Sequence, residues 1–176
     1  TTMQTLNELA RNIRLLIMDV DGVLTDGRIY YNAQGEESKS FYVQDGLGLK
    51  LLQTTDIKLA IISGRADRCV EHRASALGID YYYAGVRDKK VALDELLAET
   101  GLTAKQCAFI GDDLIDLPIL RRVGLAVTVP DASALVRQHS HYVTGSPGGH
   151  GAVREVAELI MQAQGTFDAI IARFLA

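Results

Sequence analysis

The sequence has little cysteine, no excess of positive charge and no long apolar run, and each of these absences excludes a class of protein. Because the formal net charge is −4, the chain has no basic surface of the kind that binds nucleic acid. The apolar run from Leu15 to Met18 ends at Asp19 and is far shorter than the ~20 residues that cross a bilayer, and no signal peptide precedes it. We therefore expect a soluble, cytoplasmic protein with neither a nucleic-acid partner nor a membrane partner.

The two cysteines, Cys69 and Cys107, do not have the spacing of a metal site or of a disulfide framework. Each lies within an apolar segment, and small thiols are often fully buried. We expect both to be core residues.

The length fits a single domain. A chain of 176 residues that is 48% hydrophobic and 23% charged has the composition of a globular protein. A second core or a separate lid would need more chain. We therefore expect one domain over residues 1–176.

Short apolar segments alternate with helical patterns along the chain. The expected helices have recognisable ends, with Gly78 and Gly101 as left-handed C-caps, Asp88 and Asp131 as N-caps, and Pro118 in a first turn. Strands that are buried on both faces and joined by crossover helices form parallel sheets. The sequence therefore predicts an α/β fold with a doubly wound, mostly parallel, Rossmann-like sheet. The predicted strands are Leu15–Asp19, Lys58–Ile62, Tyr81–Ala84, Cys107–Ile110, Leu125–Val129 and His141–Val143.

One stretch, residues 27–43, breaks this alternation. It has the pattern of two strands, Arg28–Asn32 and Glu37–Val43, which would form a projecting hairpin. A lone hairpin is marginally stable in water, so its apolar side chains need a surface that covers them. That surface is either another copy of the chain or the chain's own sheet, and the sequence leaves both open. The side chains concerned are Ile29, Tyr30, Tyr31, Phe41 and Tyr42.

Asp19 and Asp21 directly follow the first predicted strand. They leave it at its carboxyl end, where open α/β sheets bind ligands, so two carboxylates point at one crevice. A calcium loop would need further oxygen ligands, whereas Val23 and Leu24 interrupt any such array. Taken alone, the pair also fits a solvated acidic turn.

A second acidic cluster, formed by Asp112, Asp113 and Asp116, follows the predicted strand that ends at Ile110. Like charges about 4 Å apart repel by ~1 kcal/mol in water and by more in a cleft. Two such clusters at one sheet edge therefore need a cation or raised pKa values, and carboxylate oxygens favour Mg²⁺. Asp113 also fits as a favourable charge at the start of the next helix.

Two further strand ends supply groups that bind anions. Ser63 and Gly64 offer a hydroxyl and backbone donors at a helix start, and Lys89 offers a positive charge to a phosphoryl group. Taken singly, Ser63 is a common helix cap, and Lys89 or Lys90 is a common surface cation. Only the ordered set of all four segments is informative.

This ordered set resembles the haloacid dehalogenase superfamily of phosphotransferases. The four motifs of that superfamily match Asp19-x-Asp21, Ser63, Lys89 and Gly111-Asp112-Asp113 with Asp116, over nearly the whole chain. Other segments resemble its capless, tetrameric branch, the 3-deoxy-D-manno-octulosonate 8-phosphate phosphatases, which act in lipopolysaccharide precursor synthesis. These segments are residues 21–27, 44–46, 62–65 and 148–155.

The resemblance implies a magnesium-dependent phosphatase that forms an aspartyl-phosphate. Asp19 would attack phosphorus, and Asp21 would protonate the leaving oxygen and then activate water. Mg²⁺ would be held by Asp19, by the backbone carbonyl of Asp21 and by Asp112. Ser63 and Lys89 would bind the phosphoryl oxygens.

The resemblance also implies supporting and substrate-binding groups. Asp116, together with Asp113, would lie behind the metal ligands, where Asp116 orients Lys89 or a metal-bound water. The substrate is a phosphorylated sugar acid, whose carboxylate suits a planar guanidinium. Arg65 and Arg73 are the candidates, alongside Ser63, Gly64 and Lys89 at the phosphoryl group.

The hairpin and the C-terminal tail, residues 145–176, would close a neighbouring subunit's cleft in a homotetramer. Residues 145–151 form either a mobile connector or a closing flap, and His150 stands where the family pattern has a basic residue. The last helix carries an apolar stripe that we expect to pack against a neighbour. This stripe consists of Phe167, Ile170, Ile171 and Phe174.

Two other functions remain open. A phosphatase of a nine-carbon keto-sugar acid, of the acylneuraminate type, would place an acidic residue where this chain has Arg65, so Arg65 favours the octulosonate. A phospho-aspartate switch of the receiver type also clusters aspartates with a hydroxyl and a lysine. Its phosphorylated aspartate follows a middle strand of the sequence, however, whereas Asp19 follows the first.

Overall fold

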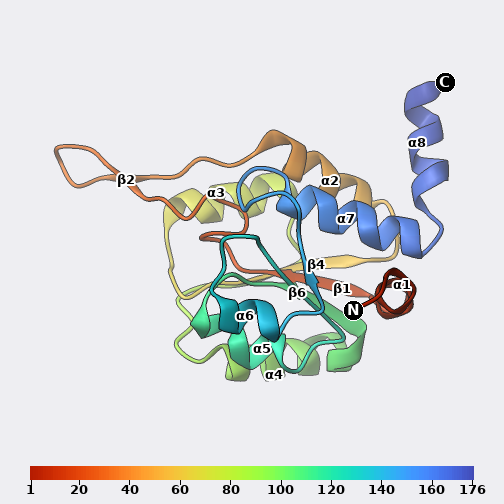
Figure 1. Ribbon diagram of the computed structural model, residues 1–176. Helices are drawn as coiled ribbons and strands as arrows, with labels where there is room; N and C mark the ends of the chain where they lie inside the picture. Colours follow the sequence, from red (N-terminus) through yellow and green to blue (C-terminus); the bar gives the residue numbers. More distant parts are fainter.

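The computed structural model describes residues 1–176 and contains a six-stranded sheet in which every pairing is parallel. The strand order is β5-β4-β1-β6-β7-β8 (Figure 1). This is the doubly wound, Rossmann-like sheet that the sequence predicts, and all six predicted strands are present. They are β1 (Leu15–Met18), β4 (Lys58–Ile62), β5 (Tyr81–Tyr83), β6 (Cys107–Ile110), β7 (Leu125–Thr128) and β8 (Tyr142–Val143).

The strand order creates a switch point beside β1. From β1 the chain moves outward to β4 and β5, and it then returns to β6 on the other side of β1. Met18 pairs with Ile61 of β4 and with Ile110 of β6, so the three strands end together. Ligands bind at such a point in open α/β sheets. The residues that follow these strands are therefore brought to one crevice.

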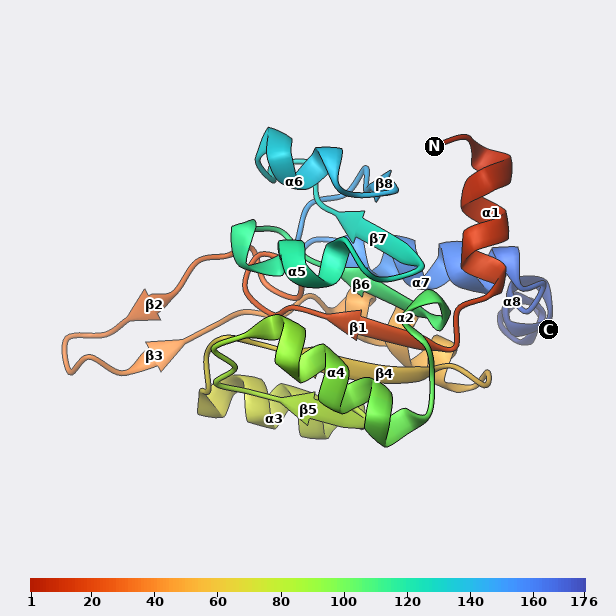
Figure 2. The same cartoon turned by 90° about the horizontal axis from the view of Figure 1, so that it is seen from below.

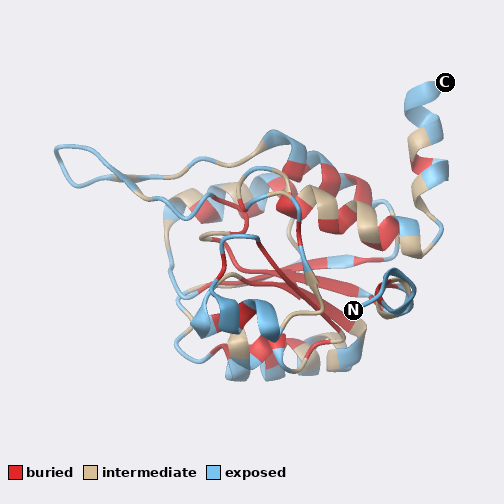
Figure 3. Ribbon diagram, viewed as in Figure 1, coloured by how far each residue is buried: buried red, intermediate tan, exposed pale blue.

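Helices cover both faces of the sheet because its central strands are apolar on both sides. In β1, Leu16 and Met18 belong to one buried cluster, and Leu15 and Ile17 belong to the other. Figure 1 shows α2, α3 and α7 on one face and α4, α5 and α6 on the other, and Figure 3 shows that their buried sides face the strands. Figure 2 shows α1 at the end of the sheet opposite to the hairpin. The helices are α1 (Met3–Arg11), α2 (Val43–Gln53), α3 (Arg68–Leu77), α4 (Lys89–Thr100), α5 (Leu117–Leu120), α6 (Ala134–Gln138), α7 (Ala152–Ala163) and α8 (Phe167–Leu175).

Most of the predicted helix ends are confirmed. Gly78 and Gly101 end α3 and α4 in the left-handed region, with φ of 64° and 73°. Asp88 caps α4 through its side chain, and Pro118 lies in the first turn of α5. Local chain chemistry therefore sets where these helices stop and start.

The prediction that Asp131 caps a helix is wrong. The helix α6 begins after Ser133, which has the extended backbone of an N-cap. The amide of Ala132 donates to the carbonyl of Val129, so the chain makes a turn at Asp131 before the helix can begin.

The hairpin projects away from the sheet (Figure 1). Its strands, β2 (Tyr30–Tyr31) and β3 (Glu37–Ser38), pair in an antiparallel sense and are shorter than predicted, because the chain that follows β3 turns back onto the body. There Phe41 packs against the core, whereas Tyr30 and Tyr31 remain exposed. The chain's own core thus covers the base of the hairpin and leaves its middle uncovered.

After β8 the chain passes over the loop that follows β1. The amide of Gly149 donates to the carbonyl of Val23 at 3.0 Å. A side chain at Gly148 would collide with the carbonyl of Gly22, since its Cβ would lie 1.8 Å from that oxygen. Residues 145–151 therefore form a turn that is packed on this loop, and they are not a loose connector.

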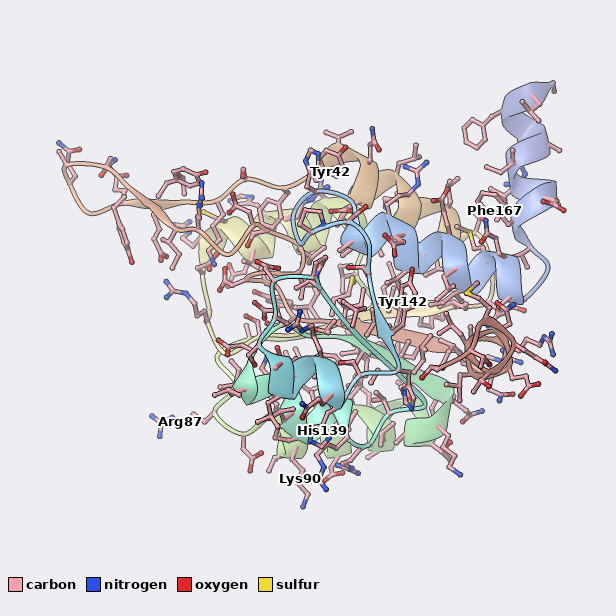
Figure 4. The ribbon with its side chains drawn as sticks, in the orientation of Figure 1. Tyr42, Arg87, Lys90, His139, Tyr142 and Phe167 are labelled. Atoms are coloured by element: carbon pink, nitrogen blue, oxygen red, sulfur yellow. The ribbon has the colours of Figure 1, made fainter.

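The C-terminal helix is less buried than the rest. Phe167 packs partly against the core, and Figure 4 shows it between α8 and α7. Ile170 is buried, but Phe174 is exposed. The apolar stripe of α8 is therefore only half covered by this chain.

Cys107 is buried, as predicted, but Cys69 is only half-buried. It lies in the first turn of α3, where its Sγ is 3.7 Å from the carbonyl oxygen of Glu37 in the hairpin. The expectation of a core thiol fails there because the neighbouring segment is the exposed hairpin. None of the helices has the length and apolar composition that crossing a lipid bilayer requires.

Candidate active site

Asp19, Lys89 and Asp116 form a chain of buried ion pairs at the carboxyl edge of the sheet. Asp19 directly follows β1, Lys89 begins α4, and Asp116 ends a short 3-10 turn, Leu114–Asp116, after β6. Lys89 Nζ lies 3.0 Å from Asp19 Oδ2 and 2.6 Å from Asp116 Oδ1. All three residues are buried, and buried charges are costly unless they are paired. The lysine therefore links the ends of two strands electrostatically.

Asp116 also holds the loop that carries the second acidic cluster. Its Oδ2 accepts hydrogen bonds from the amides of Asp112 at 2.9 Å and Asp113 at 3.2 Å. Gly111 leaves room for this contact, because a Cβ there would lie 2.6 Å from the Cβ of Asp116. Both oxygens of Asp116 are thus committed within the protein.

The site carries more negative charge than Lys89 neutralises. Carboxylate oxygens of Asp19, Asp112 and Asp116 lie within 4.8 Å of one another. Burial, and then repulsion by Asp116, raises the pKa of Asp19; burial, and then repulsion by Asp19, raises the pKa of Asp112. Burial alone would lower the pKa of Lys89, but Asp19 and Asp116 outweigh it and raise that pKa. The lysine is therefore a permanent cation beside two carboxyl groups that resist ionisation.

A hard divalent cation fits between the carboxylates of Asp19 and Asp112. Asp116 has no free oxygen, since one binds Lys89 and the other binds two amides. The Asp112 carboxylate stands beside Gly22, where a Cβ would lie 1.9 Å from Asp112 Oδ2. Carboxylate oxygens are the ligands that magnesium prefers, and a cation would relieve the repulsion that raises both pKa values. Asp19 and Asp112 thus fit as metal ligands, and Asp116 fits as their support.

Ser63 lies at the same edge, directly after β4, and is buried. Its amide donates to the carbonyl of Tyr83 at 2.9 Å, and its Oγ accepts from the amide of Arg65 at 3.3 Å. Gly64 is exposed, and a Cβ there would meet only the carbonyl of Val86 at 3.6 Å. The serine hydroxyl is therefore held in place at the end of the strand next to β1.

The two arginines that sequence analysis proposed for the substrate lie in different surroundings. Arg65 is exposed and forms an ion pair with Glu37 of the hairpin, and its Nε lies 3.9 Å from Asp21 Oδ2. Arg73 packs on the ring of Phe41, 5.7 Å from its centroid, and its Nε is buried without a hydrogen-bond partner. Arg65 therefore reaches the site, whereas Arg73, on α3, extends to Phe41 at the end of the hairpin.

Sequence reasoning missed Lys39, which contacts Asp21, and Asp67, which holds Lys39. Lys39 Nζ lies 2.8 Å from Asp21 Oδ1 and 2.7 Å from Asp67 Oδ2. Burial lowers the pKa of Lys39, but its hydrogen bonds to Asp21 and Asp67 outweigh burial and raise it. The only signal in the sequence is a lysine within an otherwise uncharged stretch, residues 38–43, which is a weak one.

Comparison with known proteins agrees with this geometry. The sequence model of the haloacid dehalogenase-like hydrolases matches residues 85–156. The 3-deoxy-D-manno-octulosonate 8-phosphate phosphatase of Yersinia pestis is 55% identical over 155 residues, which cover 88% of this chain and 83% of that protein. The enzyme of the same name from Escherichia coli K12 is 49% identical over 159 residues, or 90% of this chain and 85% of that protein. The chain belongs to the 3-deoxy-D-manno-octulosonate 8-phosphate phosphatase family.

Solved structures of the family have the same fold. The family enzyme from Moraxella catarrhalis, crystallised with a magnesium ion, a phosphate ion and a KDO molecule, has a TM-score of 0.96 and 48% identity, with 98% of this chain and 99% of that chain covered. The cobalt-bound enzyme from Haemophilus influenzae has a TM-score of 0.90 and 42% identity, with 96% and 99% covered. The recognition of this family from its motifs, and the fold expected from it, are confirmed.

In this member of the family, the structure brings together Asp19, Lys89, Asp112 and Asp116, and it places Ser63 at the end of the adjoining strand. The Asp113 side chain accepts from the amide of Leu114 and caps the 3-10 turn. Lys90 points away from the site into solvent (Figure 4).

Proposed function

We propose that this chain is a magnesium-dependent phosphatase that hydrolyses 3-deoxy-D-manno-octulosonate 8-phosphate to the free sugar acid and phosphate. The observation that carries this proposal is the position of Lys89 Nζ between Asp19 and Asp116. The Asp112 carboxylate lies in the same cluster. Three functions meet at one point. Asp19 supplies the nucleophilic carboxylate, Lys89 supplies a cation for the phosphoryl oxygens, and Asp19 and Asp112 supply oxygen ligands for a metal. The relatives that carry this name cover most of the chain.

The reaction proceeds in two displacements. Asp19 attacks phosphorus, and the bond between phosphorus and the sugar oxygen breaks as Asp21 gives that oxygen a proton. In the second step Asp21 takes a proton from water, and the water oxygen attacks the phosphoryl group on Asp19. The acyl phosphate bond breaks, and Asp19 returns as a carboxylate.

Lys89 and Ser63 bind the non-bridging phosphoryl oxygens during both steps. The charge of Lys89 is worth more in this buried setting than it would be in water. Asp116 keeps the ammonium group in place and holds the Asp112 loop at the same time. Lys89 is thus pre-organised before substrate arrives, and it need not reorient as charge develops.

Asp19, the backbone carbonyl of Asp21 and Asp112 would hold the magnesium. When bound, the ion neutralises carboxylates and phosphoryl oxygens and thereby lowers the repulsion between the nucleophile and its dianionic substrate. The raised pKa values of Asp19 and Asp112 fit this assignment.

Arg65 and Arg73 supply the contacts to the sugar acid. The Arg65 guanidinium stands beside Asp21 and can pair with a carboxylate in two parallel hydrogen bonds. To do so it exchanges Glu37 for the substrate. Arg73 is the more distant candidate, since its guanidinium packs on Phe41 and its buried Nε has no hydrogen-bond partner within the chain.

Phosphate release from a panel of sugar acid phosphates, with and without Mg²⁺, tests the function. We expect the highest kcat/KM for 3-deoxy-D-manno-octulosonate 8-phosphate and none without the metal. A higher kcat/KM for an acylneuraminate 9-phosphate would assign the enzyme to the nine-carbon acids instead. A stable phosphoprotein that does not turn over would indicate a switch.

We infer that the chain is one domain, without a cap, and that it assembles as a homotetramer in the cytoplasm. Exposed Tyr30, Tyr31 and Phe174 support the assembly, because apolar surface of this kind is usually covered by a partner. Two free thiols suit a reducing compartment. Sedimentation at micromolar concentration tests the assembly, and a monomer would contradict it.

A further inference from the structure

Lys39 connects the hairpin to the residue that handles the proton. It follows β3 directly, and its ammonium group lies 2.8 Å from Asp21 Oδ1 and 2.7 Å from Asp67 Oδ2. The Lys39 side chain is 0% exposed, although the residue as a whole is only half-buried. Its charge is therefore enclosed between two carboxylates and is not a solvated surface cation.

Asp67 anchors Lys39 to the start of α3. Asp67 is the N-cap of α3, and its Oδ1 accepts from the amide of Val70 at 2.9 Å while its Oδ2 binds Lys39. Asp67 thus connects Lys39 to the first turn of α3. The same segment of the hairpin is fastened a second time, by the ion pair between Glu37 and Arg65.

The two oxygens of Asp21 are made different by these contacts. Oδ1 accepts a charge-assisted hydrogen bond from Lys39, whereas Arg65 Nε lies 3.9 Å from Oδ2, which is beyond hydrogen-bond distance. Asp21 lies in the turn after Asp19, beside Gly22 at φ 84°. Lys39 donates the one hydrogen bond that the Asp21 carboxylate accepts, so Lys39 fixes its orientation.

We propose that Lys39 is a positioning residue that fixes the Asp21 carboxylate through Oδ1, so that Oδ2 faces the leaving oxygen of the substrate. The proposal rests on the proposed function, since it assigns the proton transfer to Asp21. It also gives the base of the hairpin a part in catalysis, because Lys39 is carried by the strand that returns from the hairpin.

This role predicts different effects on the hydrolysis of alkyl and aryl phosphate esters. When the bond between phosphorus and a sugar oxygen breaks, the oxygen leaves as an alkoxide unless it receives a proton in the same step. A nitrophenolate leaves without one. Misplacing the Asp21 carboxylate therefore slows the first displacement for an alkyl phosphate and spares it for an aryl phosphate, whereas the second displacement is slowed for both.

The test compares kcat/KM for 3-deoxy-D-manno-octulosonate 8-phosphate and p-nitrophenyl phosphate in the wild-type enzyme and in Lys39→Met, with saturating Mg²⁺. Since kcat/KM reports steps up to the first displacement, we expect a loss of about 100-fold for the sugar ester and of less than about 3-fold for the aryl ester. Lys39→Met should also release a burst of nitrophenolate equal to the enzyme, because hydrolysis of the phospho-Asp19 becomes slow. Lys58→Met is the matched control, since Lys58 is exposed at the start of β4.

Two further variants separate positioning from charge. Lys39→Arg should recover most of the sugar-ester activity, and Asp67→Asn, which keeps an oxygen to cap Val70, should lose part of it with the same preference for the aryl ester. Equal losses for the two esters in Lys39→Met would overturn the proposal and assign Lys39 to phosphate binding or to folding. No loss for either would overturn it as well.

Failure of the proposed function would look different. It would be seen in the wild-type enzyme, as hydrolysis of p-nitrophenyl phosphate without preference for the octulosonate ester. The role of Lys39 is then tested with the primary-alcohol phosphate that the wild type hydrolyses best. The loss of kcat/KM for that ester in Lys39→Met is compared with the loss for p-nitrophenyl phosphate, as before.

Discussion

Lys89 and Asp116 are 27 residues apart in the sequence, yet Nζ and Oδ1 lie 2.6 Å apart in a buried ion pair. The other oxygen of Asp116 binds the amides of Asp112 and Asp113. One side chain therefore fixes both the phosphate-binding cation and the loop that carries a metal ligand.

Asp116→Ala should consequently affect stability as well as activity. It leaves the Lys89 ammonium with one partner and two amides without an acceptor, and breaking a buried pair costs about 3–5 kcal/mol. Urea unfolding should show that the free energy of unfolding falls by this amount. Asp116→Asn, which keeps an acceptor for the amides, should lose clearly less, and an equal loss would contradict the role of those hydrogen bonds.

Asp19→Asn should remove nearly all activity, by at least about 10⁴-fold, because an amide is a poor nucleophile. The fold should persist. Burial raises the pKa of Asp19, so the ionised form costs free energy in the metal-free protein, and the amide should melt at the same or a higher temperature without metal. Full activity in this variant would exclude the covalent role.

Removing the metal should abolish turnover and lower the melting temperature. EDTA should do both, and added Mg²⁺ should raise the melting temperature in proportion to the logarithm of its concentration, since only the folded chain binds it. In Asp112→Asn, the same rise in melting temperature should require a Mg²⁺ concentration at least about 10-fold higher. Asp113→Asn is the control, because the Asp113 side chain caps Leu114, and an equal effect of both would argue against Asp112 as a ligand.

Arg65→Gln should raise KM for the sugar acid ester by about 10-fold, since hydrogen bonds to charged groups are worth ~1.5–3 kcal/mol and Arg65 must first release Glu37. KM for p-nitrophenyl phosphate, which has no carboxylate, should stay unchanged. Arg87→Gln provides the comparison, because Arg87 extends into solvent in Figure 4. Equal increases for both esters would place Arg65 at the phosphate.

His141 should make the fold less stable in mild acid. Its Nδ1 accepts from the amide of Ala126 at 2.8 Å, and burial, followed by the N-terminal charge, lowers its pKa. A His pKa below the unfolded value of about 6.5 means that its contribution is present above that pH and is lost as the pH falls.

Urea unfolding at pH 7, 6 and 5 checks this. His141→Asn keeps an acceptor that does not titrate. Relative to this variant, the wild type should lose stability over that range by up to about 1.4 kcal/mol per pH unit, whatever pH dependence the other groups give to both proteins. Parallel profiles for the two proteins would contradict the assignment.

The sequence predicts the sheet well because its strands are apolar on both faces and are bounded by glycines and caps. β4 and β6 agree with the prediction to the residue. The end of each strand then fixes where Asp19, Ser63 and Asp112 emerge, so the metal and phosphate groups follow from topology.

The contacts of the hairpin could not be predicted in the same way. Lys39 meets Asp21 only because the chain doubles back after β3, and no periodic pattern encodes that return. Asp131 failed as a cap for a similar reason, since a turn over residues 129–132 shifted the start of α6. Irregular segments depend on tertiary contacts that local propensity does not contain.

The contact of Gly148 and Gly149 with the loop at Gly22 and Val23 bears on synthesis of the chain. The loop that follows β1 leaves the ribosome early, but the turn at residues 145–151 that packs on it is translated on the order of ten seconds later at typical rates of 5–20 residues per second. Until then the nascent loop has only one side supported. Ribosome-bound chains that stop before this turn should therefore be cut by proteases within residues 20–27, and chains that include it should resist.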